Sequence, residues 1–349
     1  MSGRPIQKGD RVFLVDGSNF IFRAYFQSMN QDRRYLYRSD GLPTGAVRLF
    51  AVKMLQFVTE GALGVMPTHL AIIFDKSENS FRKALYPAYK ANRSAPPEDL
   101  VPQFPLMRET VKAFGLVPVE QDTYEADDLI ATYARLAVEA GAEVLIISAD
   151  KDLMQLIEPG VAMYDPASGQ AGAKGAREER RIGRDEVIEY FGVPPERVVD
   201  VQALSGDSTD NVPGAPGIGI KTAAQMIQEY GDLETLLARA GEIKQPKKRE
   251  TLTNPEVIEK VRVSRKLVDL VRNVPLVTPI TDLALPVFEA RPLIAFLKAM
   301  EFTTITKRIA DKADVDVNEV EPEERLKVGN YGGRAPSPSS SPLVGEGRE

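Results

Sequence analysis

Nine carboxylates in short motifs are the candidate catalytic and metal-binding residues of this sequence. Gathered without partners, such acids would repel one another and be mostly protonated. Mg²⁺ or Mn²⁺ would keep them ionised, because these hard cations prefer oxygen ligands. Two ions about 4 Å apart serve phosphodiester hydrolysis, in which one activates water and the other stabilises the departing oxygen. The candidate metal ligands are Asp16, Asp75, Glu125, Asp127, Asp128, Asp150, Asp152, Asp207 and Asp210.

Three of these acids lie within four residues, in the stretch TYEADDLIATYARLA over 123–137. Acids are common in the first turn of a helix, where they offset its positive end, and this simpler explanation applies here too. On an ideal helix Glu125 and Asp127 would lie about 160° apart and could not face one metal ion. We therefore expect Glu125 at or before the helix start, with its backbone out of line with the helix.

Short apolar runs that alternate with helical patterns must position these acids. The runs at 11–17, 68–75 and 142–150 are typical of buried strands, and 45–58 and 128–141 fit helices. This order predicts a parallel sheet covered by helices, an α/β fold. Asp16, Asp75 and Asp150 each end a predicted strand, so we expect them at one edge of the sheet, where functional crevices form.

The composition narrows the possible classes of protein. The chain has 349 residues, 43% hydrophobic and 27% charged, and no apolar run long enough for a membrane helix, so we expect a cytoplasmic protein with no membrane partner. The absence of cysteine excludes disulfides and thiol catalysis. The single histidine, His69, leaves little room for imidazole-based acid/base chemistry. The net charge is −6, but residues 311–349 hold −4 of it, so overall charge is a poor argument against a nucleic-acid partner.

A basic and aromatic stretch follows the second predicted strand, over about 76–105. Bases interleaved with aromatic rings suit a surface that tracks a phosphate backbone and stacks on bases. A solvated loop is the competing interpretation. The side chains concerned are Lys76, Arg82, Lys83, Lys90, Arg93, Phe81, Tyr86 and Tyr89.

From about residue 183 the sequence pattern changes from strands and helices to short helices, and two further helical segments end this helical region. The polar residues beyond 311 should be disordered. Within the helical region, PGAPGIGIKTA (213–223) nearly spells a phosphate loop of the ATPase type, but Ile220 interrupts the motif and no strand precedes it. The alternative is a helix-hairpin-helix turn, in which Gly217 and Gly219 let backbone N–H groups face a phosphate near Lys221. A turn that only connects two helices, with no role in DNA binding, is the competing interpretation.

Five motifs, in this order and spacing, closely resemble the flap endonuclease and 5′–3′ exonuclease family, including the 5′ nuclease segment of bacterial DNA polymerase I. They are LVDGSNFIFRAYF (14–26), FDKSENSFRKALYPAYKANR (74–93), YEADDLIATYA (124–134), ISADKDLMQLI (147–157) and LSGDSTDNVPGAPGIGIKTA (204–223). The resemblance implies a PIN-like (Rossmann-like), twisted, mainly parallel sheet with a helical arch, plus an all-α subdomain with a helix-hairpin-helix. We accordingly expect a catalytic domain over 1–182 with the arch around 76–105, a helical DNA-binding domain over 183–310, and a disordered tail over 311–349.

The resemblance also implies roles for individual residues. Asp16, Asp75, Glu125 and Asp127 would bind a first Mg²⁺ ion, and Asp127, Asp150, Asp152 and Asp210 a second, with Asp128 and Asp207 supporting. Mn²⁺ could replace Mg²⁺, and K⁺ could occupy the hairpin turn. Arg82 and Lys90 would join the acids as catalytic residues. The expected DNA contacts are Phe22, Arg23, Arg82, Lys90, Arg93, Gly217, Gly219, Lys221 and Thr222.

The function implied is that of a 5′–3′ exonuclease and structure-specific 5′-flap endonuclease that acts on nicked or flapped DNA in primer removal and repair. A non-catalytic DNA-junction binder and a PIN-type ribonuclease are the alternatives. Two departures from the family pattern stand out: a longer basic stretch over 167–183, and a chain that stops where a polymerase would continue. We expect a monomer without polymerase activity, either free-standing or the front piece of a larger protein. A polymerase that acts on the same substrate is the expected protein partner.

Overall fold

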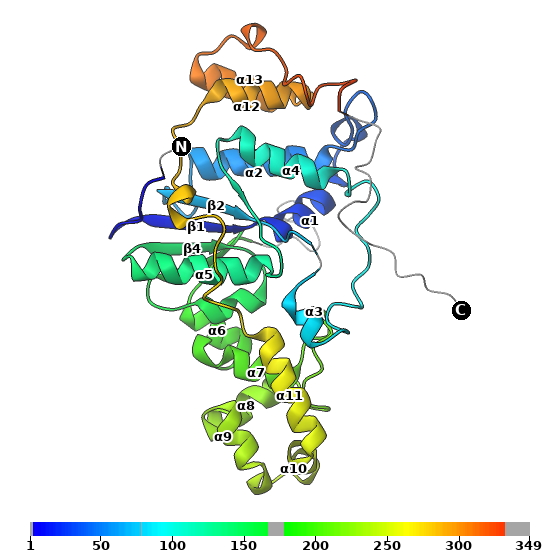
Figure 1. Ribbon diagram of the computed structural model, residues 1–349, viewed down its shortest axis with the longest axis vertical. Helices are drawn as coiled ribbons and strands as arrows, with labels where there is room; N and C mark the ends of the chain where they lie inside the picture. Colours follow the sequence, from blue (N-terminus) through cyan, green and yellow to red (C-terminus); the bar gives the residue numbers. More distant parts are fainter. Residues whose placement is uncertain (1–2, 78, 167–177, 332–349) are drawn as a thin grey trace, which may run out of the picture.

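The computed structural model of the protein describes residues 3–77, 79–166 and 178–331. Most of the longer basic stretch, 167–183, therefore lies outside the described residues, as do 332–349 of the expected tail. Figure 1 shows a layered α/β body from which a helical extension projects. The expected fold class is confirmed: a mostly parallel sheet plus a C-terminal helical domain.

A sheet of six strands forms the centre of the body, in the order β3-β2-β1-β4-β5-β6. Only β6 runs antiparallel to its neighbour, β5. Successive residues of β1 face opposite cores: Val12 and Leu14 lie in one, Phe13 and Val15 in the other, as expected of a strand buried on both faces. The strands are β1 (Arg11–Asp16), β2 (His69–Ile73), β3 (Pro118–Val119), β4 (Glu143–Ile147), β5 (Val161–Asp165) and β6 (Arg180–Ile182).

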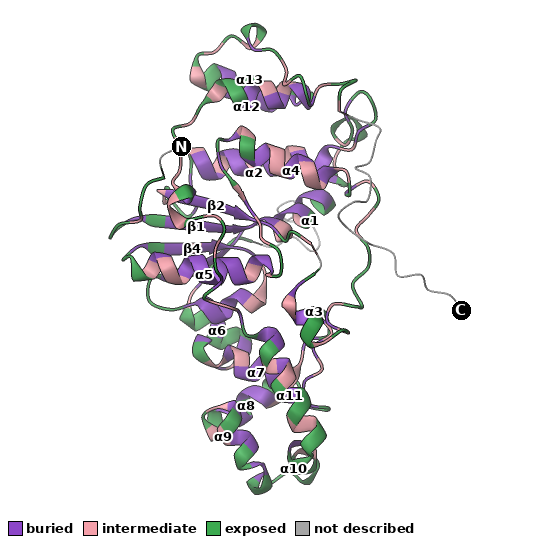
Figure 2. Ribbon diagram, in the orientation of Figure 1, coloured by how far each residue is buried: buried purple, intermediate pink, exposed green. Residues whose placement is uncertain are grey.

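Helices cover both faces of the sheet (Figures 1 and 2). One core lies under α1, α2 and α4, and the other lies under α5 and continues into the helical domain without a break. This continuity means that the body built around the sheet and the helical domain share apolar packing. The covering helices are α1 (Gly17–Ser28), α2 (Gly45–Thr59), α4 (Gln103–Ala113) and α5 (Ala126–Glu139).

The helical domain is built from α6 to α11, which narrow to a tip at α9 and α10 (Figure 1). The expected arch segment, 76–105, contains the short helix α3 (Phe81–Leu85), followed by turns before α4. The helices of the domain are α6 (Arg184–Phe191), α7 (Val198–Ser205), α8 (Ile220–Tyr230), α9 (Leu233–Ala238), α10 (Pro246–Thr253) and α11 (Pro255–Val268). The 3₁₀ turns are η1 (Arg33–Tyr35), η2 (Lys151–Leu156), η3 (Pro195–Arg197), η4 (Ala240–Glu242), η5 (Ile280–Leu283) and η6 (Val317–Glu319).

The C-terminal helices differ from expectation. Helices α12 (Ala290–Ala299) and α13 (Thr303–Ala313) pack on the layer of α2 and α4, not on the helical domain that we placed over 183–310. Residues 311–331 are anchored to the body at two buried side chains, although we expected a disordered tail. Val320 and Leu326 are buried, and the Arg38 guanidinium donates to the carbonyl oxygens of Ala299 and Leu326. The polar composition of this segment concealed the few apolar side chains that anchor it.

Candidate active site

The carboxyl end of the sheet carries a group of acids. Asp16 ends β1, and its Oδ1 accepts a hydrogen bond from the backbone N–H of Asn19, 2.9 Å away, which caps α1. Its Oδ2 accepts another from the Ser148 hydroxyl at 2.7 Å. Gly17 permits this turn, since a Cβ there would lie 2.5 Å from the Phe74 ring. The turn from β1 into α1 therefore fixes the carboxylate at the sheet edge.

Asp75 and Asp150 follow β2 and β4 at the same edge. The Asp75 carboxylate accepts from the backbone N–H of Ala126 at 2.8 Å, which brings it to the start of α5 beside Asp127. Asp150 caps η2 by accepting from the Asp152 N–H at 2.9 Å. We call Asp16, Asp75 and Asp150, together with Asp127 from the first turn of α5, the strand-end acids. Asp16, Asp75 and Asp150 lie at one edge of the sheet, as the sequence predicted.

These acids influence one another strongly. Burial, followed by the charges of Asp150 and Asp75, raises the pKa of Asp16 from 3.8 to about 7. Burial and the charges of Asp150 and Asp16 likewise raise the pKa of Asp127 well above its usual value. This group therefore carries more negative charge than its surroundings compensate.

A second group of acids is held by basic side chains instead. Glu125 is the N-cap of α5, with φ −84° and ψ 161°, so the expectation that it precedes the helix is confirmed. Its Oε2 accepts from Lys90 Nζ at 3.0 Å and from the Tyr89 hydroxyl at 3.1 Å. Burial opposes ionisation of Glu125, but the charges of Lys90 and Arg82 outweigh it and lower its pKa.

The loop between α7 and α8 supplies two more acids of this second group. Gly206 and Gly214 have φ of +68° and +59°, and a Cβ on Gly214 would lie 2.4 Å from the Gly206 nitrogen, so the loop closes tightly on itself. Arg93 forms an ion pair with Asp210. Lys151 forms one with Asp207 and, at 3.1 Å, another with Asp152. The paired acids are Glu125, Asp128, Asp207 and Asp210.

Asp152 shares features of both groups. Lys151 and the Gln202 amide donate to its Oδ1, the latter at 2.6 Å. Burial and the neighbouring charge of Asp150 nevertheless raise its pKa to about 6. Asp152 therefore links the strand-end acids to the paired acids.

Arg82 and Asp128 do not occupy the positions that their expected roles require. Arg82 has a relative exposure of 1% and Asp128 of 0%, and the two form a bidentate ion pair at 2.6 and 2.7 Å. A guanidinium this buried cannot reach a phosphate at the surface, and Asp128 turns both oxygens away from the strand-end acids to Arg82 and the backbone. Burial next to the acids of α5 was not visible in the basic pattern of 76–105.

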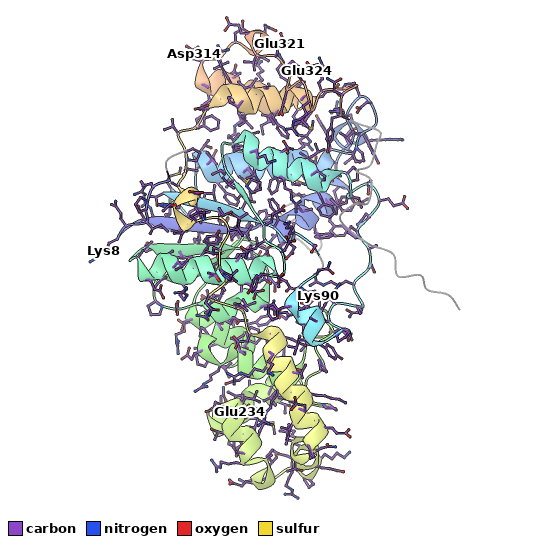
Figure 3. All side chains as sticks on the ribbon, in the orientation of Figure 1. Lys8, Lys90, Glu234, Asp314, Glu321 and Glu324 are labelled. Atoms are coloured by element: carbon purple, nitrogen blue, oxygen red, sulfur yellow. The ribbon has the colours of Figure 1, made fainter. Side chains whose placement is uncertain are left out.

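Some side chains expected to contact DNA are exposed, and others form ion pairs with acids of the protein. Phe22 is 38% exposed, with its ring 6.2 Å from that of Phe104. Arg23 instead pairs with the buried Asp165 at 2.8 Å. Lys90 and Arg93 face Glu125 and Asp210, and Figure 3 shows Lys90 near α3, between the body and the helical domain.

The hairpin turn before α8 is open. Gly217 has a φ of +74°, Gly219 is the N-cap of α8, and neither glycine has a neighbour within 4 Å of a built Cβ. Lys221 is exposed and Thr222 half-buried in the first turn of α8. The backbone N–H groups of such a turn are accessible to an anion.

No three carboxylate or imidazole side chains in the described part of the chain are arranged to hold a metal ion as they stand. The neighbouring acids help to raise the pKa of Asp16 and Asp127, whereas the acids of the second group form ion pairs with Lys90, Arg93 and Lys151. Entry of an ion therefore requires side-chain movement at this edge.

Family models match most of the chain. Residues 11–192 match the family described as "5′-3′ exonuclease, N-terminal resolvase-like domain", and residues 193–291 match "5′-3′ exonuclease, C-terminal SAM fold". The chain belongs to the 5′–3′ exonuclease family. The family expected from the five motifs is therefore confirmed.

Curated relatives of this 5′–3′ exonuclease chain carry the name DNA polymerase I. The protein from Rhizobium leguminosarum is 52% identical over 320 residues, which cover 91% of this chain and 30% of the relative. The one from Bacillus caldotenax is 33% identical over 299 residues, covering 86% of this chain and 32% of the relative. The chain thus spans about a third of the length of these relatives.

Solved structures share the exonuclease fold at low identity. A flap endonuclease of bacteriophage T5, solved as a pseudo-enzyme-product complex with DNA and metal ions, matches with a TM-score of 0.58 and 21% identity, covering 87% of this chain and 99% of the other. The catalytic core of Rad2 in complex with a DNA substrate matches with a TM-score of 0.54 and 15% identity, covering 89% and 95%. These likenesses support the fold.

Two residues of the exonuclease site were missed from sequence: Ser148 holds Asp16, and Gln202 holds Asp152. The only available signal was the position of Ser148, two residues before Asp150 in SADKD. Tyr89, which the sequence suggested as a ring for base stacking, instead donates to Glu125. Lys151 could have been noticed as a base enclosed by two acids.

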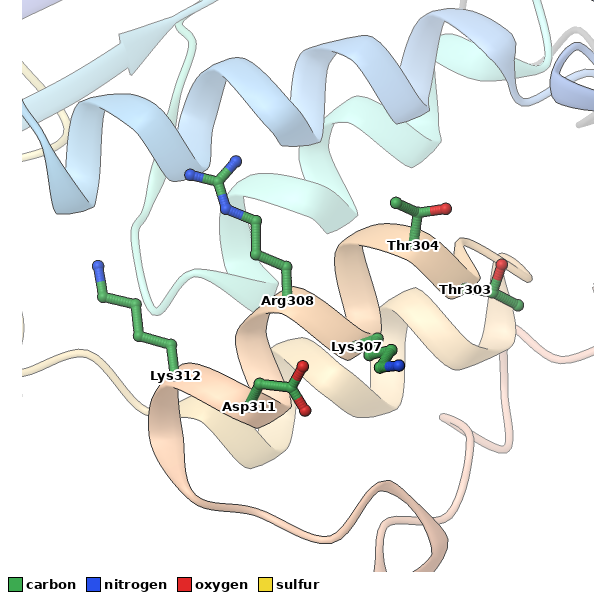
Figure 4. Close-up of a pocket in the computed structure, with 6 residues that line it drawn as sticks. All are labelled: Thr303, Thr304, Lys307, Arg308, Asp311 and Lys312. Atoms are coloured by element: carbon green, nitrogen blue, oxygen red, sulfur yellow. The ribbon is translucent and has the colours of Figure 1, made fainter.

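A shallow depression on α13 lies apart from these acids (Figure 4). Its lining includes Lys307, Arg308 and Lys312, and Arg308 reaches toward α2, where it pairs with Glu60 at 3.0 Å. It contains none of the candidate site residues. In the described part of the chain, no helix is both long and apolar enough to cross a membrane.

Proposed function

We propose that this exonuclease-family chain is a metal-dependent 5′ nuclease that removes nucleotides or flaps from 5′ ends of DNA, as needed in primer removal and repair. One observation carries the proposal: buried acids gather at the carboxyl end of the sheet without enough positive charge among them. An external cation resolves such a charge imbalance, and phosphodiester hydrolysis is the reaction that clustered carboxylates and divalent ions serve.

The donor set fits Mg²⁺ or Mn²⁺, because every side chain of the cluster offers oxygen. Asp16, Asp75, Glu125 and Asp127 are proposed for one ion, and Asp127, Asp150, Asp152 and Asp210 for the other, with Asp207 in support. When bound, the ions would activate water and stabilise the departing oxygen.

The chain's own basic residues would bind and orient the DNA. Lys90 and Arg93 lie against Glu125 and Asp210, and ions that neutralise these acids would free both bases to hold the phosphate at the cleavage point. Phe22 offers an exposed ring on which a base can stack. The open turn at 217–222 would bind the phosphates of the duplex, with K⁺ proposed at the same turn.

The related proteins support the proposal from outside the chain. The flap endonuclease of phage T5 was solved with DNA and metal ions, and another structure of this phage exonuclease holds zinc. The relatives named DNA polymerase I suggest a partner activity: a polymerase that extends the strand behind the cleaved 5′ end.

A comparison of two substrates tests the proposal. The protein is incubated with labelled 5′-flap DNA or with a matched single-stranded RNA, in Mg²⁺ or in EDTA. We expect cleavage of the flap that requires Mg²⁺. Flap binding without cleavage would instead indicate a junction binder, and preferential cleavage of the RNA would indicate a PIN-type ribonuclease.

A further inference from the structure

The largest fully buried side chain of the described residues belongs to Arg82, in the first turn of α3 at the base of the arch segment. Its guanidinium grips the Asp128 carboxylate with two nitrogens, and its Nε donates to the carbonyl oxygen of Leu267 at 2.7 Å. A further contact, at 3.3 Å, reaches the carbonyl oxygen of Asp269. Arg82 therefore joins the arch to the chain that leaves α11.

Asp128 uses all of its hydrogen-bonding capacity inside the protein. Its Oδ2 accepts from Arg82 at 2.6 Å and from the backbone N–H of Glu125 at 3.1 Å. Its Oδ1 accepts from Arg82 at 2.7 Å and from the backbone N–H of Val271 at 2.9 Å. A carboxylate has about four acceptor positions, so none is left for an ion.

Three separate segments therefore meet at this one pair. They are the base of the arch through Arg82, the start of α5 through the Glu125 backbone, and the end of α11 with the chain that follows it, through Leu267 and Val271. The Glu125 backbone N–H donates to Asp128, while the Glu125 carboxylate accepts from Lys90 and Tyr89. Gln155 also holds the end of α11 and the chain after it: its side-chain amide donates to the carbonyl oxygen of Val268 and accepts from the backbone N–H of Leu270.

We propose that Arg82 and Asp128 are a positioning pair, which holds the arch, the acid-bearing start of α5 and the helical domain in register, and that neither residue touches phosphate or metal. This inference rests on the proposed nuclease function and replaces the phosphate-binding and metal-supporting roles expected for these two residues. A buried ion pair suits such a role because removing one partner strands a charge, whereas removing both does not.

The double variant Arg82→Gln/Asp128→Asn is the central test, because it leaves no unpaired buried charge and should fold where a single variant fails. We expect it to bind as many Mn²⁺ ions as the parent, counted from the free Mn²⁺ signal. We also expect the parent slope of flap affinity against salt concentration, with cleavage slower by about a hundredfold through misplacement of the reacting groups.

Each result that would contradict the positioning role points to a different function of the pair. A loss of one Mn²⁺ ion would make Asp128 a ligand, and a slope shallower by about 0.7 to 0.9 would make Arg82 a phosphate contact. Cleavage at the parental rate would remove the positioning role. Arg93→Gln and Asp127→Asn serve as matched controls for a lost phosphate contact and a lost ligand.

The single variants, where they fold, give a second measure. Two residues that work as one positioning pair should not have multiplicative effects on cleavage: the double variant should be no slower than the slower single variant. A product of the two single effects would overturn the pairing. Failure of the parent protein to cleave in Mg²⁺ would refute the nuclease proposal, whereas the ion count and the salt slope are measured without cleavage.

Discussion

The strand-end acids and the paired acids lie side by side but differ in how their charge is balanced. Burial and mutual repulsion raise the pKa of Asp16 and Asp127, whereas basic side chains lower the pKa of Glu125 and Asp207 despite their burial. Lys90 and Lys151 thus balance the charge of the second group, whereas mutual repulsion dominates in the first. Under the proposed function, the first group would recruit ions from solution, and the second would exchange a basic side chain for an ion.

The largest effect is expected where the two ion sites would share a ligand. Asp127→Asn should slow cleavage of flap DNA by more than about a hundredfold while flap binding persists, because the variant removes a bridging carboxylate and no DNA contact. Single-turnover cleavage and a binding isotherm measure the two. The matched control is Asp122→Asn, an exposed acid paired with Lys76. Cleavage at a tenth of the parental rate or more would mean that Asp127 bridges no ions.

A smaller effect is expected from a base of the second group. Lys90→Ala should weaken flap binding by about tenfold, because the chain loses the ammonium that the ions would free to meet the phosphate. Affinity is measured with Ca²⁺ in place of Mg²⁺ so that cleavage does not interfere, beside Lys307→Ala on the distant α13. Equal affinity of Lys90→Ala and Lys307→Ala for the flap would show that Lys90 does not contact the DNA.

The burial of Asp16 and Asp152 among other acids should appear in the pH dependence of stability without metal. The raised pKa of Asp16, about 7, and of Asp152, about 6, mean that stability is full below the ordinary pKa and is lost as pH rises through these values. In EDTA the Tm should therefore be higher at pH 5.5 than at pH 8, by roughly 5 °C. Calorimetry checks this. Mg²⁺ should flatten the difference, and a Tm that rises with pH in EDTA would contradict it.

The smallest effect is expected at the hairpin turn. Lys221→Ala should make the dependence of duplex affinity on salt shallower by about 0.9, as for one lost phosphate contact, with little change in cleavage of bound substrate. Fluorescence anisotropy over a range of salt concentrations provides the slope. The same change at Lys307 is the control, and an identical slope in both variants would place the duplex elsewhere.

The sequence predicted the sheet, the acids at its edge and the helical domain, because strand periodicity and the order of the motifs are local features. It could not predict that Arg82 turns inward, because its partners Asp128 and Leu267 come from two distant segments. The fate of residues 311–331 was hidden for a related reason. Their composition is polar, and single side chains such as Leu326 hold them to the body.

The most direct test of the central claim is a count of bound divalent ions. Mn²⁺ is titrated into the metal-free protein, and the free ion is followed by electron paramagnetic resonance for the parent and for Asp127→Asn. We predict two ions for the parent and a loss of at least one in the variant. Absence of Mn²⁺ binding at millimolar concentration, or an unchanged count in Asp127→Asn, would contradict the claim that these acids recruit ions.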